Sequence, residues 1–315
     1  MTSRAPVLNY LGMILMALLV GTMIPSLVVL LPLWDPLFLS AARYLVAIPM
    51  FVVVLLIVQR GRLLPPGLPY LRLLYLAVFG YGMFSPMFTI GVYLCHPATA
   101  AILSSSAPVV SALVGRIGFG LPFDRRLLPS IVLTVLGAII ATYDPSESGL
   151  GLTGGEPLII LAMVMWSWYS LAAQRWLSGM SQIRITGLTI LPGAVMITIV
   201  YLVAGALGFA DLPPAPPRAW TDVAIVVWMA FACLFLGILL WNHGIRQFGI
   251  VIPSLYMNLV PVVAIGLSAA LGHPPTYWHL AGGLLVCAGI LLSYLRRRRP
   301  TPVDTASMQR REEPS

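Results

Sequence analysis

Long apolar runs alternate with short polar segments along almost the whole chain. Each run holds about 20 mostly hydrophobic residues, the length that an α-helix needs to cross the hydrocarbon core of a bilayer. We predict ten membrane-spanning helices, at residues 10–32, 36–58, 71–93, 97–117, 127–143, 156–177, 186–209, 221–244, 249–271 and 276–295. The first run is longer than the apolar core of a secretory signal and lacks a small-residue cleavage site, so we predict that it is retained.

The composition indicates lipid rather than water as the main solvent. Hydrophobic residues make up 59% of the chain and charged residues 9%, whereas soluble domains carry about 25% charged residues. The predicted fold class is therefore an all-α integral membrane protein.

The distribution of positive charge along the chain predicts which loops face the cytoplasm. All 18 basic residues are arginine, and 13 of them gather in alternate connecting segments, at residues 60–72, 116–126, 175–184, 246 and 296–299. The intervening connections hold the acidic residues Asp35, Asp144, Glu147, Glu156, Asp211 and Asp222, with Arg218 as their one arginine. Because arginine-rich loops stay in the cytoplasm, we predict that both termini are cytoplasmic. The net charge of +8 is assigned to topology, and nucleic acid is not expected as a partner.

Two features recur at nearly one offset. Pro108-Val109-Val110 returns 153 residues later as Pro261-Val262-Val263, and Gly137 matches Gly289 at an offset of 152. A first repeat at 1–145 and a second at 156–295 are predicted, joined by a linker at 146–155 and followed by a disordered cytoplasmic tail at 296–315. Since each repeat holds five spans, an odd number, the two repeats would be inverted relative to each other.

These features resemble the EamA-domain transporters of the drug/metabolite transporter superfamily over about residues 10–296. The resemblance rests on Arg43 in "SAARYLVA", on "SSSAPVV" and "MNLVPVV", and on "HLAGGLLVCAGILLSY" from His279 to Tyr294. The chain departs from the family's Leu-Gly-Glu step, with "FGLPF" at Phe119–Phe123 and Leu271-Gly272-His273. The resemblance implies two five-helix repeats and export of a small metabolite across a bacterial plasma (inner) membrane.

Arg43 is the clearest functional candidate because ionisable groups at bilayer depth are costly. It lies eight residues after Asp35, about 12 Å along a helix. It is expected either to anchor a substrate carboxylate or phosphate, or to serve structurally by reaching the headgroups or backbone carbonyls. No Asp or Glu lies at the centre of a predicted span, which favours facilitated diffusion or exchange over proton coupling. His243, near the inner end of the eighth span, is either a structural residue or the exception to that inference.

Polar and aromatic residues in the spans are predicted to line a cavity, although close helix packing explains them almost as well. Ala101, Ser105, Pro108 and Ala112 are predicted to share one helical face of the fourth span, by their i, i+4, i+7 spacing. The candidate substrate-binding residues are Arg43, Tyr81, Ser85, Ser105, Trp166, Tyr169, Ser170, Tyr256 and Asn258, and the candidate kinks or hinges are Pro86, Pro108 and Pro261.

The predicted function is secondary transport of an amino acid or a related amphipathic or aromatic solute by alternating access. An intramembrane enzyme, such as a lipid-modifying transferase, and a non-transporting assembly protein are the alternatives. We find no catalytic motif, and the three cysteines have no metal-ligand spacing, so no cofactor or metal is expected. The expected partners are a small-molecule substrate and membrane lipid. The oligomeric state is left open, and a monomer is compatible with the sequence.

Overall fold

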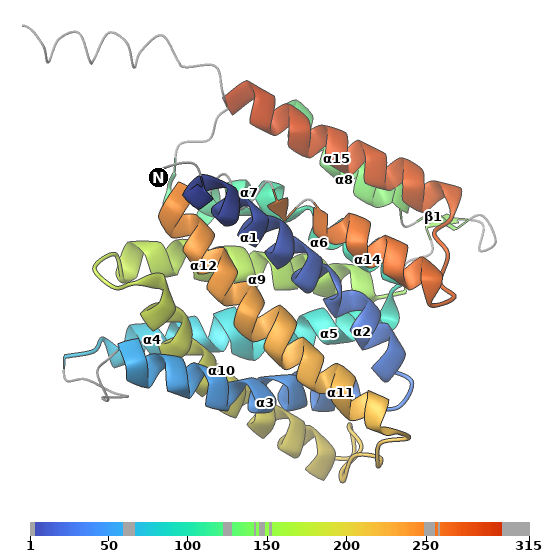
Figure 1. Cartoon of the computed structure of the whole chain (residues 1–315). Coiled ribbons are helices and arrows are strands. Elements are labelled where there is room, and N and C mark those ends of the chain that lie inside the picture. The colour runs from blue at the N-terminus through green and yellow to red at the C-terminus, as the bar shows by residue number, and fades with distance from the viewer. Residues whose placement is uncertain are drawn as a thin grey trace, which may run out of the picture.

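The fold is built almost entirely from helices that run in alternating directions across the bundle (Figure 1). A computed structural model describes residues 4–58, 67–121, 128–141, 143–144, 149–150, 153–248, 256–257 and 259–297. The predicted site residue Asn258 and the tail beyond residue 297 lie outside these ranges. The elements of the first half are α1 (Arg4–Gly21), α2 (Met23–Leu30), α3 (Pro36–Val58), α4 (Tyr70–Ala77), η1 (Val78–Met83), α5 (Phe84–Leu94), α6 (Pro97–Ser104), α7 (Ala107–Phe119) and α8 (Leu128–Ala141).

A small antiparallel ribbon follows the first half. Its strands are β1 (Tyr143–Asp144) and β2 (Gly149–Leu150), with Tyr143 paired to Leu150. The elements of the second half are α9 (Gly155–Trp176), α10 (Gln182–Ala206), α11 (Trp220–Trp228), η4 (Met229–Leu236), α12 (Gly237–Phe248), α14 (Leu259–Ala270) and α15 (Tyr277–Arg297).

Six stretches of the described residues are long and apolar enough to cross a membrane: Asn9–Leu30, Pro36–Val58, Tyr70–Leu94, Gly155–Trp176, Ile183–Ala206 and Trp220–Gly244. A seventh is the pair α6 and α7, if a span bent by 50° is counted as one. The shorter apolar helices Ile131–Ala141 and α14 fall within two more of the predicted runs, and α15 falls within the last. The protein is therefore an all-helical membrane protein, while the full count of ten spans stays a prediction.

Helices of the first half pack against helices of the second half in matching pairs. α3 packs on α10, and α8 packs on α15. α1 packs on α12 and α14, just as α9 packs on α5 and α7. Each of these contacts is reproduced when the two halves are exchanged. Figure 1 shows α8 and α15 along one edge of the bundle and α3 and α10 along the opposite edge.

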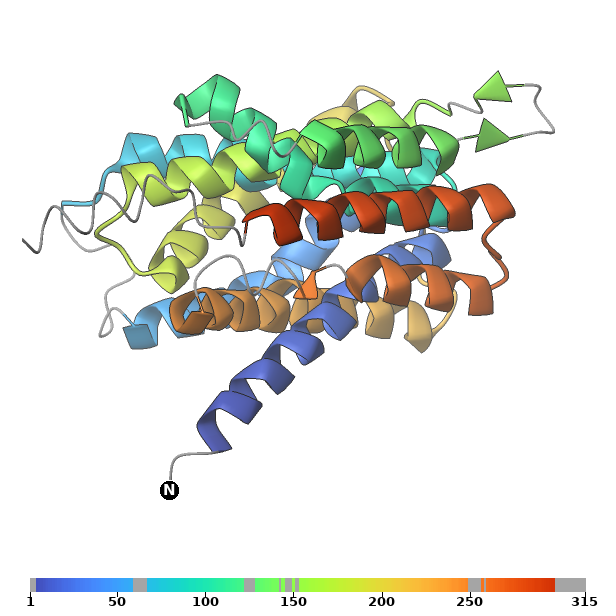
Figure 2. The same ribbon diagram turned by 90° about the horizontal axis from the view of Figure 1, so that it is seen from above.

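The α8–α15 pair is close because glycine faces glycine. A Cβ atom added to Gly282 would meet Ala141 N at 2.7 Å and would also clash with the Gly137 carbonyl. A Cβ on Gly137 would lie 2.6 Å from the Gly282 carbonyl oxygen. Small residues at such a contact let two backbones approach, which supplies packing energy where lipid offers no hydrophobic drive. Figure 2 shows the two helices side by side along their length.

The fourth predicted span is broken at its serines. α6 ends at Ser104 and α7 begins at Ala107, so Ala101, Ser105, Pro108 and Ala112 do not share one continuous helical face, and that expectation was wrong. Pro108 is the second residue of α7, where its missing N–H costs no helical hydrogen bond. The hydroxyls of Ser104, Ser105 and Ser106 donate to the carbonyls of Ala100, Ile102 and Leu103 at 2.7, 2.6 and 2.6 Å. Ile102 O and Leu103 O also accept backbone N–H groups only three residues on, from Ser105 at 3.1 Å and Ser106 at 3.0 Å, so the hydroxyls add a second hydrogen bond where the regular α-helical bonding ends.

Replacing both Ser105 and Ser106 with alanine is expected to lower the free energy of unfolding by about 1 kcal/mol, because each lost bond in a membrane protein costs about 0.6 kcal/mol. Ser170→Ala is the matched control: its hydroxyl donates to Trp166 O at 2.8 Å within the unbroken helix α9, where the regular hydrogen bonds continue past that carbonyl. Thermal unfolding in detergent measures both variants. An equal loss in the control would contradict the role given to the break.

The third and eighth predicted spans each contain a π-helical segment near the middle. These are η1 and η4, which lie about one repeat offset apart. η1 comes just before Pro86 in α5, and a wider turn before a proline relieves the clash between its ring and the preceding carbonyl. Pro261, by contrast, lies in the first turn of α14.

Candidate functional site

Arg43 lies inside the bundle rather than at its surface. Its side chain is on α3, and the residue is 1% exposed. Nη2 donates to Ser85 Oγ at 2.7 Å and to Thr89 Oγ1 at 2.9 Å. Nη1 contacts Met23 Sδ at 3.2 Å, and Cζ lies 5.6 Å from the centroid of the Tyr44 ring. The guanidinium therefore lies within the protein, and its hydrogen-bond partners are side chains rather than backbone carbonyls.

The sequence spacing explains how these groups meet. Ser85 and Thr89 are four residues apart and share one face of α5, which packs on α3. Thr89 Oγ1 donates to Ser85 O at 3.0 Å and accepts a hydrogen bond from Ser40 Oγ at 2.9 Å. Ser40, three residues before Arg43 on α3, thereby holds Thr89 in place as an acceptor.

Arg43 has no counter-ion among the described residues. The ion pair found there joins Arg218 to Asp222, and the Arg43 Nε atom has no hydrogen-bond partner in the described part of the chain. A buried cation without a partner is costly, and two hydroxyl dipoles compensate that cost only in part. The site is therefore electrostatically suited to an anion, and a carboxylate or phosphate group would supply the missing charge.

An aromatic cluster lies beside Arg43. The Tyr44 and Tyr81 rings are 6.0 Å apart between centroids, and Tyr81 lies 6.1 Å from Trp166 and 5.2 Å from Tyr169. The hydroxyls of Tyr81 and Tyr169 are 3.2 Å apart, and Tyr169 OH lies 3.1 Å from Thr189 Oγ1 on α10. Aromatic and hydroxyl groups from α3, η1, α9 and α10 thus meet next to the guanidinium, in a region drawn from both halves.

The structure brings together five of the predicted site residues: Arg43, Tyr81, Ser85, Trp166 and Tyr169. The hydroxyls of Ser105 and Ser170 do not join this region, because they donate to carbonyls three and four residues earlier in their own segments. Tyr256 is half-buried. Tyr44, Thr89, Ser40 and Thr189 were missed. Three of them stand one, three or four residues from a predicted site residue, so the helical spacing was the signal that could have found them.

His243 has a contact that suits a structural residue. It is exposed on α12, and its Nε2 atom lies 3.0 Å from Asn9 Oδ1 on α1. The contact between His243 and Asn9 joins α12 to α1 near the N-terminal end of the bundle.

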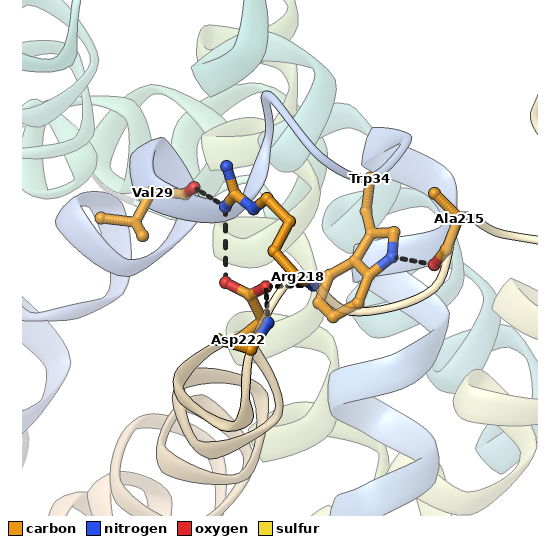
Figure 3. A network of polar contacts seen from close by, with 6 residues as sticks. Val29, Trp34, Ala215, Arg218 and Asp222 are labelled. Atoms are coloured by element: carbon orange, nitrogen blue, oxygen red, sulfur yellow. Dashed lines mark hydrogen bonds and ion pairs between the residues drawn. The ribbon is translucent and has the colours of Figure 1, made fainter.

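The opposite end of the bundle carries Asp35, Glu156, Asp211 and Asp222, and we call it the acidic end. A cavity of about 240 Å³ opens there between Trp34, Asp35, Tyr93 and Asp211. The proline-rich connector is fastened beside it: Trp34 Nε1 donates to Ala215 O at 2.7 Å, and Arg218 bonds both Val29 O and Asp222 Oδ1 at 3.4 Å (Figure 3). These contacts tie the connector between α10 and α11 to the connection between α2 and α3. Within the described residues, no group of three His, Cys, Asp or Glu side chains is placed to hold a metal ion.

Both halves of the chain match the same protein family. The model of the EamA-like transporter family matches residues 7–143 and again residues 153–295. The chain belongs to the EamA-like transporter family. A transport role follows from that membership, and neither a substrate nor a direction comes with it.

Curated relatives cover most of this family member. The uncharacterized transporter YyaM of Bacillus subtilis (strain 168) is 26% identical over 80% of the chain and 82% of its own length. The uncharacterized transporter YrdR of the same organism is 22% identical over 89% and 88%. The inner membrane protein YtfF of Escherichia coli (strain K12) is 25% identical over 68% and 67%.

A solved crystal structure has the same fold. It covers 95% of this chain and 100% of its own, with a TM-score of 0.64 and 16% sequence identity. At that identity the likeness concerns the fold alone.

Proposed function

We propose that this protein is a secondary transporter that exports a small carboxylate-bearing metabolite, such as an amino acid or a related amphipathic or aromatic solute. The observation that carries the proposal is the buried Arg43 guanidinium, which has two hydroxyl partners and no counter-ion among the described residues. A substrate carboxylate would complete its charge. The neighbouring Tyr44, Tyr81 and Trp166 would contact the apolar or planar part of the solute.

Alternating access is the proposed mechanism. Arg43 is 1% exposed, so in this conformation a solute at the guanidinium would be closed off from water on both sides. The proposed substrate region draws α3 and η1 from the first repeat and α9 and α10 from the second. Movement of one repeat against the other would therefore open the region first to one face of the membrane and then to the other.

The proposed topology has ten spans in two inverted repeats, with both termini in the cytoplasm and the acidic end outside, in the plasma (inner) membrane. The matching helix contacts of the two halves support inverted repeats, and the π-helical segments at corresponding positions do so too. The arginine distribution supports the orientation.

Proteoliposomes that contain the purified protein test this function. A panel of radiolabelled amino acids, other carboxylates and nucleosides is offered with and without a pH gradient, beside protein-free liposomes. We expect uptake of at least one carboxylate solute, with a similar rate with and without a gradient that keeps both sides above about pH 7, because no carboxyl side chain lies at the centre of a predicted span. Transport of uncharged nucleosides alone would overturn the substrate class, and strict dependence on the gradient would overturn facilitation.

A further inference from the structure

Three of the chain's four histidines meet at the acidic end of the bundle. His96 lies between α5 and α6, His273 between α14 and α15, and His279 in the first turn of α15. The rings of His96 and His279 are stacked, with centroids 4.4 Å apart and planes 17° apart. The His273 ring lies edge-on to His96 at 6.5 Å. The stacked pair joins the first repeat to the second.

Hydrogen bonds fix where the proton sits on His279. Its Nδ1 atom accepts the backbone N–H of Thr276 at 2.9 Å, so this nitrogen carries no proton. In the neutral ring the proton is then on Nε2, which lies 3.0 Å from Thr99 Oγ1 on α6. Thr99 donates onward to Ala141 O on α8 at 3.2 Å. The neutral imidazole therefore connects α15 to two helices of the first repeat.

This bond pattern is also a helix cap. Thr276 precedes α15, its Oγ1 atom accepts from His279 N at 3.4 Å, and His279 accepts from Thr276 N in return. In the usual form of such a capping box a glutamate or glutamine stands where His279 stands. The start of α15 is thus capped by a side chain that can change its charge near neutral pH.

His96 performs a similar task for α6. It is the N-cap residue, and its Nδ1 atom accepts the N–H of Ala98 at 3.2 Å. Burial, and next the neighbouring His273, lower the pKa of His96 from its ordinary value of 6.5. Both stacked rings therefore hold an unprotonated Nδ1 atom against a backbone N–H.

Other titratable groups lie on the elements around the pair. Burial and Glu156 raise the pKa of the adjacent Cys95 thiol to about 12, so it is neutral at physiological pH. Glu156 accepts hydrogen bonds from Thr153 and Gly154 at the start of α9. Tyr93 and Tyr277 are exposed, and the Asp144 side chain lies outside the described part of the structure.

We propose that the His96–His279 pair is a proton-binding site that holds the two repeats together when neutral and releases them when protonated. A proton on either Nδ1 atom would face a backbone N–H and remove that hydrogen bond from a helix cap; on His279 its other neighbour is Thr276 Oγ1, 2.9 Å away in the same cap. Two charged rings 4.4 Å apart would repel. The closed contact is fully stable above the ordinary histidine pKa and is lost as the pH falls below it. Since the regular helix α6 also ends at Ser104, it would then have neither its N-cap bond nor a continuous helix beyond its C-terminal end.

Hydrogen–deuterium exchange of the protein in lipid nanodiscs, where both faces meet the buffer, tests the site without a known substrate. Peptides from α6 and from the first turns of α15 are compared at about pH 7.5 and about pH 5.5, after correction for the intrinsic pH dependence of exchange. We expect faster exchange at the lower pH, by up to about tenfold for each unit by which the closed state depresses the histidine pKa.

The double variant His96→Asn, His279→Gln keeps side chains that can cap both helices but removes their titration. It is expected to exchange slowly at both pH values, whereas His243→Gln, which alters the histidine outside this cluster, is expected to retain the wild-type response. If the double variant does not fold, His279→Gln alone is expected to weaken the response, because His96 then has no charged ring stacked on it. An unchanged wild-type exchange rate, or a full pH response in a variant without the titrating pair, would overturn the proposal.

Discussion

Arg43→Met is expected to lower binding and transport of a carboxylate solute by at least about thirtyfold, which corresponds to about 2 kcal/mol, the lower end of the cost of truncating one partner of a buried charge pair. Methionine matches the length of the buried stem and brings no charge. The thermal stability of the empty protein is expected to stay the same or to rise, because the variant no longer buries an unpaired cation. Proteoliposome uptake and thermal unfolding in detergent measure the two effects separately.

Two further variants sharpen this test. Arg43→Lys keeps the charge but loses the rigid planar guanidinium whose Nη2 bonds Ser85 and Thr89 while Nη1 contacts Met23, so we expect partial activity. Arg72→Met removes an exposed arginine that donates to Trp176 O at 3.2 Å, and it is expected to transport normally. If Arg43→Met lowers the unfolding temperature and leaves the transport rate per folded molecule unchanged, Arg43 serves only to hold α3 against α5.

Gly282→Ala is expected to destabilise the protein by about 2 kcal/mol or more, whereas Gly283→Ala at the next position is expected to be neutral or stabilising. The added methyl group on residue 282 would press against the backbone of α8, at 2.7 Å from Ala141 N. Backbone atoms cannot move aside as a flexible side chain can, so α8 and α15 would have to separate. The same methyl group on residue 283 would lie 3.6 Å from Ile102 Cδ1, an ordinary contact, and alanine favours the helix over glycine.

The paired substitutions separate packing from helix propensity, since both replace a glycine by alanine in the same turn of α15. Unfolding temperatures in one detergent provide the comparison. Gly137→Ala is expected to behave like Gly282→Ala, because its methyl group would lie 2.6 Å from the Gly282 carbonyl oxygen. Equal unfolding temperatures for the residue 282 and residue 283 variants would contradict the close α8–α15 contact.

The apolar runs predicted where the helices lie because the bilayer imposes both a length and a composition on them. They did not predict the interruptions. The break between Ser104 and Ala107 is compatible with an unbroken apolar run, because the three serine hydroxyls all bond carbonyls of the same segment and need no polar partner elsewhere. The π-helical segments have no composition of their own, so hydropathy could not reveal them.

In the candidate site too, the sequence indicated a residue that is unusual by itself and missed residues whose role depends on helix packing. The cost of burying Arg43 made it conspicuous in the sequence. Tyr44 and Thr89 look like ordinary residues of a span, and only the packing of α3 on α5 gives them a role. The histidine pair was not predicted, because His96 and His279 are 183 residues apart. Each lies in a connection or a first helical turn, where a hydropathy pattern marks only the boundary between two spans.

Because each contains a π-helical segment, the third and eighth spans do not have one fixed length. A π turn contains more residues than an α turn, so each residue released into regular α geometry would add about 1.5 Å to the helix and turn its far end by about 100°. The third and eighth spans could therefore change length within the membrane, at Val78–Met83 and Met229–Leu236, and each such change would displace the loop at the end of that helix.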